Sequence, residues 1–339
     1  MTLSPALETL IDALPSVVVY VDDKLYFERR DKAHEAVTLS DIKASIDSRF
    51  PYEKDALPPT DATTPLTIHV PPTIASKLPL ALVHIARDKD LDRHVHLELD
   101  RHAELTLIHL VHHEADRAVT MRLNVLAGDN AHLNILSVIS SEGDGAHATR
   151  NRVHINQHAR VVYTGGVFTH GPTHHDTEVT LAGPYAENDT NIIALTDHAQ
   201  ESLINTRVVH RAPRTRGQID HAGVAADDST LLFEGVGKIH KGMIKSQAFQ
   251  HNRGVVLGDN ARLDANPLLL IDEHDVEAGH GAAIGRIDEN QLYYLMSRGM
   301  TKTDAEKLII QGYLAPLKRA IDHDALHARL DTLLHDKIK

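Results

Sequence analysis

The 339-residue sequence contains no cysteine and no tryptophan, and only 4% of its residues are aromatic. Without cysteine, the chain can form no disulfide, offers no thiolate nucleophile and cannot by itself bind an iron–sulfur cluster through sulfur. Metal chemistry would therefore depend on histidine and carboxylate ligands, or on sulfur from another chain. Such ligands are plentiful, because the sequence contains 26 histidines.

Basic clusters and long apolar runs are also missing. The 35 Lys and Arg residues are outnumbered by 47 Asp and Glu residues, giving a net charge of −12 at pH 7. A nucleic-acid groove needs clustered positive charge, so we expect no nucleic-acid partner. The apolar run Val17–Val21 is far too short to span a bilayer or to serve as a signal peptide. We expect no membrane association and a cytoplasmic location.

The motifs of several common enzyme classes are absent. Segments 143–145 and 235–238 contain closely spaced glycines but complete neither a phosphate-binding loop nor a dinucleotide-binding fingerprint. There is no G-x-S-x-G elbow, and the lack of cysteine removes the other common nucleophile motif. We interpret both segments as turns and expect no nucleotide-hydrolysis site.

The composition and the spacing of apolar residues change twice along the sequence, which predicts three regions. We expect a mixed N-terminal region over residues 1–65, a β-rich core over 66–285 and a small all-helical C-terminal domain over 286–339. The boundaries are set by a Pro/Thr-rich stretch at 55–65 and by a change of apolar period after Gly285.

Apolar spacing predicts the elements of the N-terminal region. A helix is expected to stop at Pro15, and Val17–Tyr20 is expected to form a short strand. A second helix is predicted from Ser40 to about Ser48.

Helical spacing returns near the C-terminus. A helix is predicted over Glu289–Arg298 and is expected to end at Gly299. Thr303–Glu306 has the form of a capping box and predicts the start of the next helix. The surplus of apolar and aromatic positions in these helices suggests that they dock onto the core or onto another protein.

A repeat runs through the core. The segments HAELTL, NAHLNI and HARVVY begin 28 residues apart, at His102, Asn130 and His158. Looser copies begin at Asn188, Asp228 and Asn260. Each unit has a polar corner followed by a strand with one apolar face, which favours a coil of a parallel β-solenoid over a β-sandwich, the alternative fold.

Most of the histidines are expected on polar strand faces or at turn corners. His94, His96, His102, His158 and His198 are examples of such expected surface positions. The densest group of potential metal ligands is Asp272, Glu273, His274, Asp275, Glu277 and His280. This group could form a transition-metal site, but its spacing matches no known closed site, which favours a solvated loop at a strand end.

Segment 237–317 closely resembles the SufB/SufD family of iron–sulfur cluster assembly proteins. The resemblance is carried by ANPLLLIDEHDVEAGHGAAIGRID, beginning at Ala265, and by QLYYLMSRGM, beginning at Gln291. The SufD branch fits better than the SufB branch, because the first of these segments is SufD-like and the cysteines of SufB members are missing.

The resemblance implies a right-handed parallel β-helix with a C-terminal helical domain. It also implies a non-catalytic scaffold subunit of a SufBCD complex, which pairs with SufB and binds the ATPase SufC through the C-terminal helices. A nascent cluster would be built at the SufB–SufD interface, so we expect a transient iron–sulfur cluster in the complex and no cofactor bound stably by this chain alone. When isolated, the chain is a possible homodimer.

The resemblance also implies site residues. His280 falls on the histidine of the family's D-V-x-x-x-H-G motif and is a candidate cluster or iron ligand, with Glu277 and Asp275 as secondary candidates. Ala278 occupies a position where some members have cysteine. The residues expected to bind the partner are Tyr293, Tyr294, Met296, Arg298, Gly299, Lys307, Leu308 and Leu314.

Two alternative functions come from other classes. The first is a solenoid enzyme that acts on polysaccharide, which would need aromatic sugar platforms that this sequence hardly offers. The second is a homodimeric, histidine-rich metal-binding protein.

Overall fold

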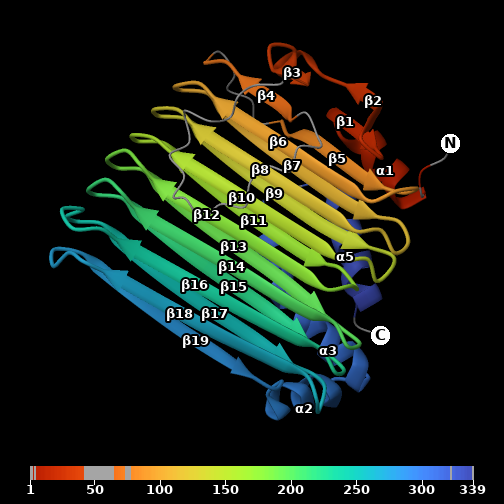
Figure 1. Ribbon diagram of the computed structural model, residues 1–339. Helices are drawn as coiled ribbons and strands as arrows, with labels where there is room; N and C mark the ends of the chain where they lie inside the picture. Colours follow the sequence, from red (N-terminus) through yellow and green to blue (C-terminus); the bar gives the residue numbers. More distant parts are fainter. Residues whose placement is uncertain (1–2, 4, 42–64, 73–77, 321–322, 338–339) are drawn as a thin grey trace.

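The computed structural model describes residues 3, 5–41, 65–72, 78–320 and 323–337. From β4 onward the chain passes back and forth between two stacked sheets, so that successive coils lie side by side (Figure 1). All pairings within the coils are parallel, while β1–β2 and β3–β4 are antiparallel. The prediction of a mainly β chain with a parallel β-solenoid core and a small C-terminal helical region is confirmed.

The strand bounds show how regular the coils are. The ten-stranded sheet consists of β1 (Ser16–Val21), β2 (Lys24–Arg29), β5 (Leu80–Ala86), β7 (Glu104–His113), β9 (His132–Ser141), β11 (Arg160–Phe168), β13 (Glu187–Thr196), β15 (Arg216–Ala225), β17 (Gln247–Val256) and β19 (Glu277–Gly285). The nine-stranded sheet consists of β3 (Thr38–Asp41), β4 (Leu66–Val70), β6 (Leu91–Leu99), β8 (Val119–Ala127), β10 (His147–Ile155), β12 (Thr173–Leu181), β14 (Glu201–His210), β16 (Thr230–Ile239) and β18 (Arg262–Ile271).

The predicted repeat corresponds to corners of the solenoid. His102, Asn130 and His158 have left-handed φ angles of 64°, 57° and 56°. The backbone N–H of each residue donates to a carbonyl oxygen of the next coil. Asparagine and histidine adopt this conformation more often than most residues, which explains why the repeat is visible in the sequence.

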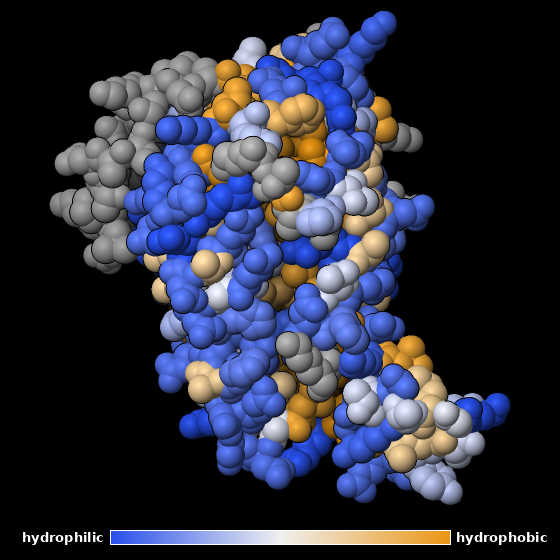
Figure 2. Space-filling view, turned by 90° about the vertical axis from the view of Figure 1, so that its right-hand side faces the viewer, coloured by the Kyte–Doolittle hydropathy of each residue, from blue (hydrophilic) through white to orange (hydrophobic). Residues whose placement is uncertain are grey.

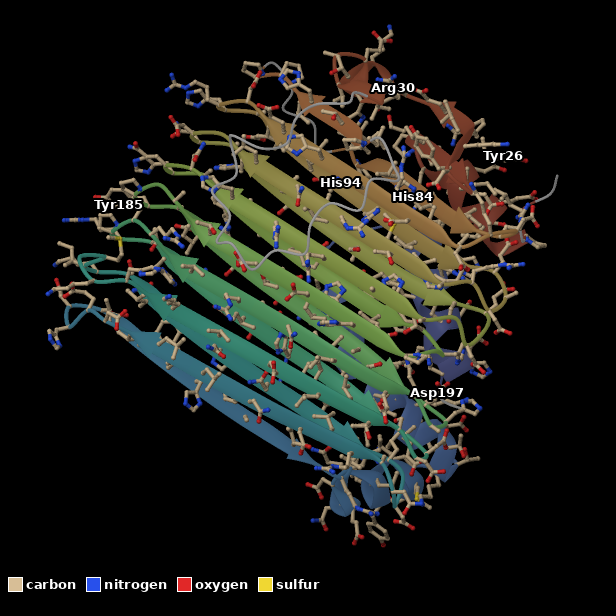
Figure 3. The ribbon with its side chains drawn as sticks, viewed as in Figure 1. Tyr26, Arg30, His84, His94, Tyr185 and Asp197 are labelled. Carbon is tan, nitrogen blue, oxygen red and sulfur yellow. The ribbon has the colours of Figure 1, made fainter. Side chains whose placement is uncertain are left out.

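The later copies of the repeat do not mark the same corner of the solenoid as the first three copies. The fourth copy is wrong by three residues, because Asn188 pairs with Val161 and the corner is formed by Tyr185, with a φ of 62°. The copies at Asp228 and Asn260 precede β16 and β18, which belong to the nine-stranded sheet. They therefore mark the opposite edge of the solenoid. Figure 3 shows Tyr185 and Asp197 at these two opposite edges.

Two apolar layers hold the molecule together. One fills the space between the sheets and extends from Val18 in β1 to Leu263 in β18. The other lies on the outer face of the ten-stranded sheet, which is covered by α1 (Pro5–Ala13), α4 (Ala315–Ala320) and α5 (Asp324–Lys337). Alternating residues of the ten-stranded sheet thus enter one layer or the other, whereas the nine-stranded sheet contributes only to the layer between the sheets.

The interior also contains a polar column that the sequence analysis missed. Nine histidines are at most 3% exposed, so the expectation that most lie on polar faces and corners is wrong for these residues. Seven of them line the space between the two sheets, namely His84, His109, His113, His147, His175, His210 and His221. His34 lies beside Ser16, and His112 lies on the outer face of β7 beside Ser140. Several are hydrogen-bonded across the interior or between coils. Nε2 of His221 lies 2.9 Å from Oγ1 of Thr206 on the opposite sheet, and its Nδ1 lies 3.0 Å from Oδ1 of Asn252 in the next coil. Polar side chains alternate on both faces of these strands, so periodicity alone does not separate inside from outside.

The N-terminal prediction is partly confirmed. The helix α1 and the strand β1 form as expected, and β1 extends the ten-stranded sheet by pairing with β5. The predicted helix at Ser40 is wrong at its start, because Thr38–Asp41 forms the edge strand β3. Its continuation and nearly all of the connector at 55–65 lie outside the described residues. A short 3₁₀ turn, η1 (Lys32–His34), links β2 and β3.

The C-terminal helices follow the last strand. α2 (Glu289–Ser297) ends as predicted, with Gly299 at a φ of 94°. α3 (Lys302–Gln311) begins earlier than predicted, because Thr301 rather than Thr303 caps it by accepting the N–H of Asp304. The 3₁₀ turn η2 (Gly312–Leu314) leads into α4. The proposed domain boundaries at residues 65 and 285 stay predictions.

Candidate functional site

The solenoid has an uncovered end formed by β18 and β19. These strands pair with β16 and β17 respectively, and within the described part of the chain no further strand pairs with either of them. In Figure 1 they form the outer edge of the stack, at the lower left. Unpaired backbone groups on such an edge can pair with a strand of another chain.

His280 lies on β19 at this uncovered end. It is in register with Gln250 of β17, which is buried and points into the solenoid. Neighbouring residues of parallel strands share a face, so His280 also faces the solenoid axis. It is exposed because no described coil follows to cover it. The imidazole therefore stands on the open end of the polar interior.

The glycines beside His280 leave the opposite face of β19 bare. Gly281 is in register with His251 of β17, whose Nδ1 lies 2.9 Å from Oδ1 of Asp220. A shallow pocket here is lined by Asp220, His251, Asn252, Arg253, Gly281, Ala282 and Ala283. Both faces of the terminal strand are thus accessible around His280.

The other predicted ligands do not converge on His280. Glu277 lies on the opposite face of the alternating strand and accepts a hydrogen bond from Nε2 of Gln247 at 3.0 Å. Asp275 lies in the preceding turn, where Glu273 accepts the backbone N–H groups of Gly242, His274 and Asp275. These backbone hydrogen bonds lower the pKa of Glu273. The acidic segment is a corner turn, and His280 stands apart from it.

Exposed apolar residues surround the uncovered end. Leu268 and Leu270 of β18 are 51% and 46% exposed, and Ile284 of β19 is 37% exposed. Exposed apolar side chains beside unpaired strand edges are typical of a protein–protein interface.

The predicted partner-binding residues form a second exposed surface on α2 and α3. Tyr293, Tyr294 and Met296 of α2 and Leu308 of α3 are exposed, Tyr293 by 75%. The Arg298 guanidinium lies 5.2 Å from the ring centre of Tyr294. In Figure 2, apolar and weakly polar residues gather on a lobe at the lower end of the molecule, where Figure 1 places these helices.

The remaining residues predicted for this surface differ in their roles. Gly299 terminates α2, and Lys307 is half-buried, with its Nζ 3.2 Å from Nδ1 of His335 on α5. The side chain of Leu314 lies outside the described residues.

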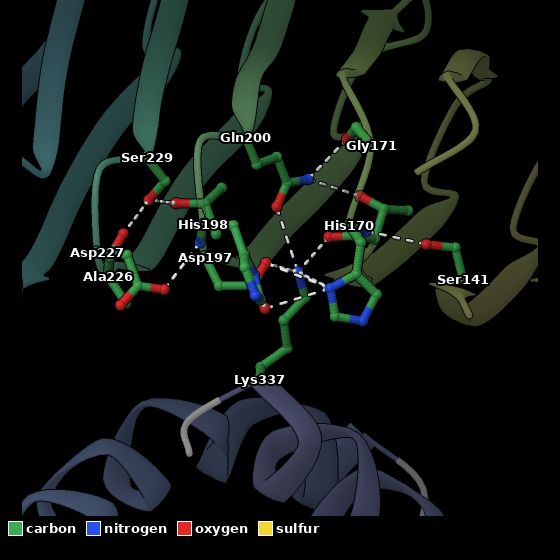
Figure 4. A network of polar contacts seen from close by, with 12 residues as sticks. Ser141, His170, Gly171, Asp197, His198, Gln200, Ala226, Asp227, Ser229 and Lys337 are labelled. Atoms are coloured by element: carbon green, nitrogen blue, oxygen red, sulfur yellow. Dashed lines mark hydrogen bonds and ion pairs between the residues drawn. The ribbon is translucent and has the colours of Figure 1, made fainter. Parts of the chain in front are cut away.

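A polar cluster that was not predicted from the sequence lies at the edge of the solenoid that faces α5. His170 and His198 flank the carboxylate of Asp197, which binds the ammonium of Lys337 at 2.6 Å (Figure 4). Asp197 and Lys337 are both buried. His170 and His198 are 28 residues apart, the period of the repeat, and this spacing was the available signal.

Electrostatics favour the ion pair in this cluster. Burial raises the pKa of Asp197, but the contacts with His170 and Lys337 outweigh it and lower the pKa to about 2. Burial lowers the pKa of Lys337, an effect that the attraction of Asp197 opposes. In the described part of the chain, this is the only group of three or more His, Asp or Glu side chains close enough to hold a metal ion together.

The solenoid, its uncovered end and the helical tail define an assembly protein of the SufB/SufD family. A family model described as "SUF system FeS cluster assembly, SufBD core domain" matches residues 84–313, so the chain belongs to this family. Within the family it is most like SufD, as the resemblance predicted. No helix in the described ranges is both long and apolar enough to cross a membrane.

Individual relatives support this assignment. The iron–sulfur cluster assembly protein SufD of Bacillus subtilis is 32% identical over 278 residues, covering 80% of this chain and 64% of that protein. SufD of Escherichia coli is 27% identical over 257 residues, covering 73% and 60%. A SufBD family protein of Mycobacterium tuberculosis is 28% identical over 143 residues, covering 42% and 17%. The chain thus spans less than two thirds of the length of these relatives.

Proposed function

We propose that the chain is a SufD-like, non-catalytic scaffold subunit of a cytoplasmic iron–sulfur cluster assembly complex. In this complex it pairs with a SufB-like subunit and binds a SufC-like ATPase. The observation that carries the proposal is the uncovered solenoid end, which presents two strand edges, exposed apolar residues and His280 together. The family assignment favours this role over a polysaccharide-acting enzyme.

Pairing with the SufB-like subunit would use β18 and β19. A partner with a similar open solenoid end would continue both sheets, satisfy the edge N–H and C=O groups and bury Leu268, Leu270 and Ile284. The interface would then have an apolar part on β18 and a polar part around His280.

The nascent cluster would be assembled at this interface. His280 would offer one imidazole ligand, since Ala278 cannot supply a thiolate and the chain has no cysteine. Histidine replaces cysteine at one iron of Rieske clusters, so imidazole ligation is chemically sound. The sulfur ligands would come from the SufB-like partner, and the site would be complete only in the complex.

The SufC-like ATPase would dock on α2 and α3. Exposed tyrosines and methionine are common anchors of protein interfaces, and Tyr293, Tyr294 and Met296 lie on one short helix. Lys307 and Leu308 on α3 would extend this surface. Nucleotide hydrolysis would belong to the partner.

Co-purification with the SufB-like and SufC-like chains of the same organism tests the proposal. We expect a complex of all three chains, and we expect Leu270→Arg to release the SufB-like chain while keeping the SufC-like chain. Leu25→Arg is the matched control, because Leu25 is similarly exposed, at 54% against 46% for Leu270, on β2 at the other end of the ten-stranded sheet. Failure of the wild-type chain to bind either partner would contradict the assignment.

A further inference from the structure

The ammonium of Lys337 occupies a cage of acceptors at the edge of the solenoid. Its Nζ contacts the carbonyl oxygen of Thr169, Oδ1 of Asp197 at 2.6 Å, Oε1 of Gln200 at 3.2 Å and Nδ1 of His170 at 3.3 Å (Figure 4). The three protons of an ammonium group match the three oxygen acceptors of Thr169, Asp197 and Gln200. Nδ1 of His170 lies within 3.3 Å of both the ammonium and the carboxylate of Asp197, so the imidazole and the ammonium share that carboxylate.

The cage contains the donor atoms of a transition-metal site. One ligand atom each from His170, Asp197 and His198 lie within 4.8 Å of one another. Two imidazoles and a carboxylate suit zinc and other divalent first-row metals. Gln200 and the Thr169 carbonyl supply further oxygen atoms on the same side.

Neighbouring coils hold these donors in position. The backbone N–H of His170 donates to Oγ of Ser141, and that of His198 donates to Oδ2 of Asp227. Nε2 of Gln200 donates to the Gly171 carbonyl at 2.8 Å, which turns its oxygen toward the cage. The donor set therefore belongs to the solenoid and does not depend on α5.

We infer that this corner is a divalent transition-metal site whose occupancy competes with Lys337. Both the metal ion and the ammonium require the carboxylate of Asp197, so binding of one disfavours binding of the other. Metal binding would release the end of α5, and docking of Lys337 would expel the metal. The site is separate from the uncovered end that carries His280.

The release requires only a small movement. Lys337 is the last described residue of α5, and the preceding part of the helix is anchored by buried leucines. These are Leu326, Leu330, Leu333 and Leu334. The final turn of α5 can leave the cage while the rest of the helix stays packed on the ten-stranded sheet.

Zinc titration of the full chain without an affinity tag tests the inference by calorimetry. Lys337→Met removes the competing charge and is expected to tighten one zinc site by at least about tenfold. Lys318→Met is the matched control, because Lys318 forms a similar 2.6 Å pair with Asp331 away from the cage. Equal zinc affinity in the two variants would overturn the inference.

Hydrogen exchange of the wild-type chain provides a second test that does not depend on the folding of a Lys337 variant. Zinc is expected to raise exchange in the final turn of α5, residues 335–337, and His198→Ala, which alters an exposed side chain, is expected to remove this response. Protection of the helix end by zinc, or an unchanged response in His198→Ala, would contradict competition at this site.

Discussion

Nε2 of His113 lies 2.8 Å from Nδ1 of His147 inside the solenoid, where both imidazoles are buried. Burial lowers the pKa of His113 to about 4 and lowers that of His147 well below its ordinary value. Both rings are therefore neutral at neutral pH, and one can donate its N–H to the other. The pair joins β7 to β10 across the interior and belongs to a column of neutral histidines.

This column predicts a loss of stability in mild acid. In the unfolded chain histidine binds a proton near pH 6.5, whereas burial lowers the pKa of His109, His113 and His221 in the folded chain to about 4. Stability is therefore retained above about pH 6.5 and falls as the pH decreases toward 4, by up to about 1.4 kcal/mol per pH unit for each such group.

Urea unfolding between about pH 7.5 and about pH 5 measures this effect. His221→Gln is expected to reduce the pH dependence, whereas His132→Gln, at an exposed position, leaves it unchanged. A stability that does not change over this range would show that the interior histidines do not titrate as the structure indicates.

Removal of a large interior side chain is expected to destabilise the solenoid strongly. Phe233 of β16 is fully buried and stacks on His221 with 4.9 Å between ring centres. Phe233→Ala leaves a cavity and should lower the free energy of unfolding by about 3–5 kcal/mol. Tyr293→Ala, at an exposed position, serves as the control and should change it by less than about 0.5 kcal/mol. Similar effects of the two substitutions would argue against the packing described.

The left-handed corners predict a dependence on residue type. Asn130 has a φ of 57°, which a β-branched residue adopts only with strain. Asn130→Val should destabilise the chain by about 1–3 kcal/mol, and Asn130→Gly should be tolerated. Thermal unfolding of the two variants gives the comparison. Equal melting temperatures would mean that this corner is not under conformational constraint.

The exposed surface of α2 predicts a localised effect on ATPase binding. Tyr293→Ala should weaken binding of the SufC-like partner by about 2 kcal/mol, the size expected for an interface anchor. Tyr185→Ala, an exposed tyrosine at a solenoid corner, is the control. Calorimetric titration measures both affinities. Unchanged binding by the Tyr293 variant would mean that the ATPase binds a surface other than α2.

The parts of the fold that depend on local chemistry were predictable from the sequence. Corner residues recur because the left-handed conformation restricts residue type, so Asn130 and His158 marked their coils correctly. The C-terminal end of α2 was visible for the same reason, through the positive φ at Gly299. The corner before Asn188 was missed because it is formed by Tyr185, which is not one of the Asp, Asn, His or Gly residues that mark corners in the other copies.

Features that depend on long-range contacts were not predictable. Lys337 and Asp197 are 140 residues apart, and nothing local to either residue indicates the pairing. His175 is buried because neighbouring coils cover it. The strand that carries it has polar residues on both faces, so its sequence pattern does not show which face is buried. The exposure of His280 follows from its place on the terminal strand, which only the order of the strands reveals.

The central claim is that the uncovered solenoid end, through His280, takes part in building a cluster with a SufB-like partner. The most direct measurement is the iron and sulfide content of the complex after anaerobic reconstitution, comparing His280→Ala with His274→Ala, an exposed histidine in the adjacent turn. The account predicts that both variants form the complex and that only His280→Ala loses the cluster. A full complement of cluster in the His280→Ala complex would contradict it.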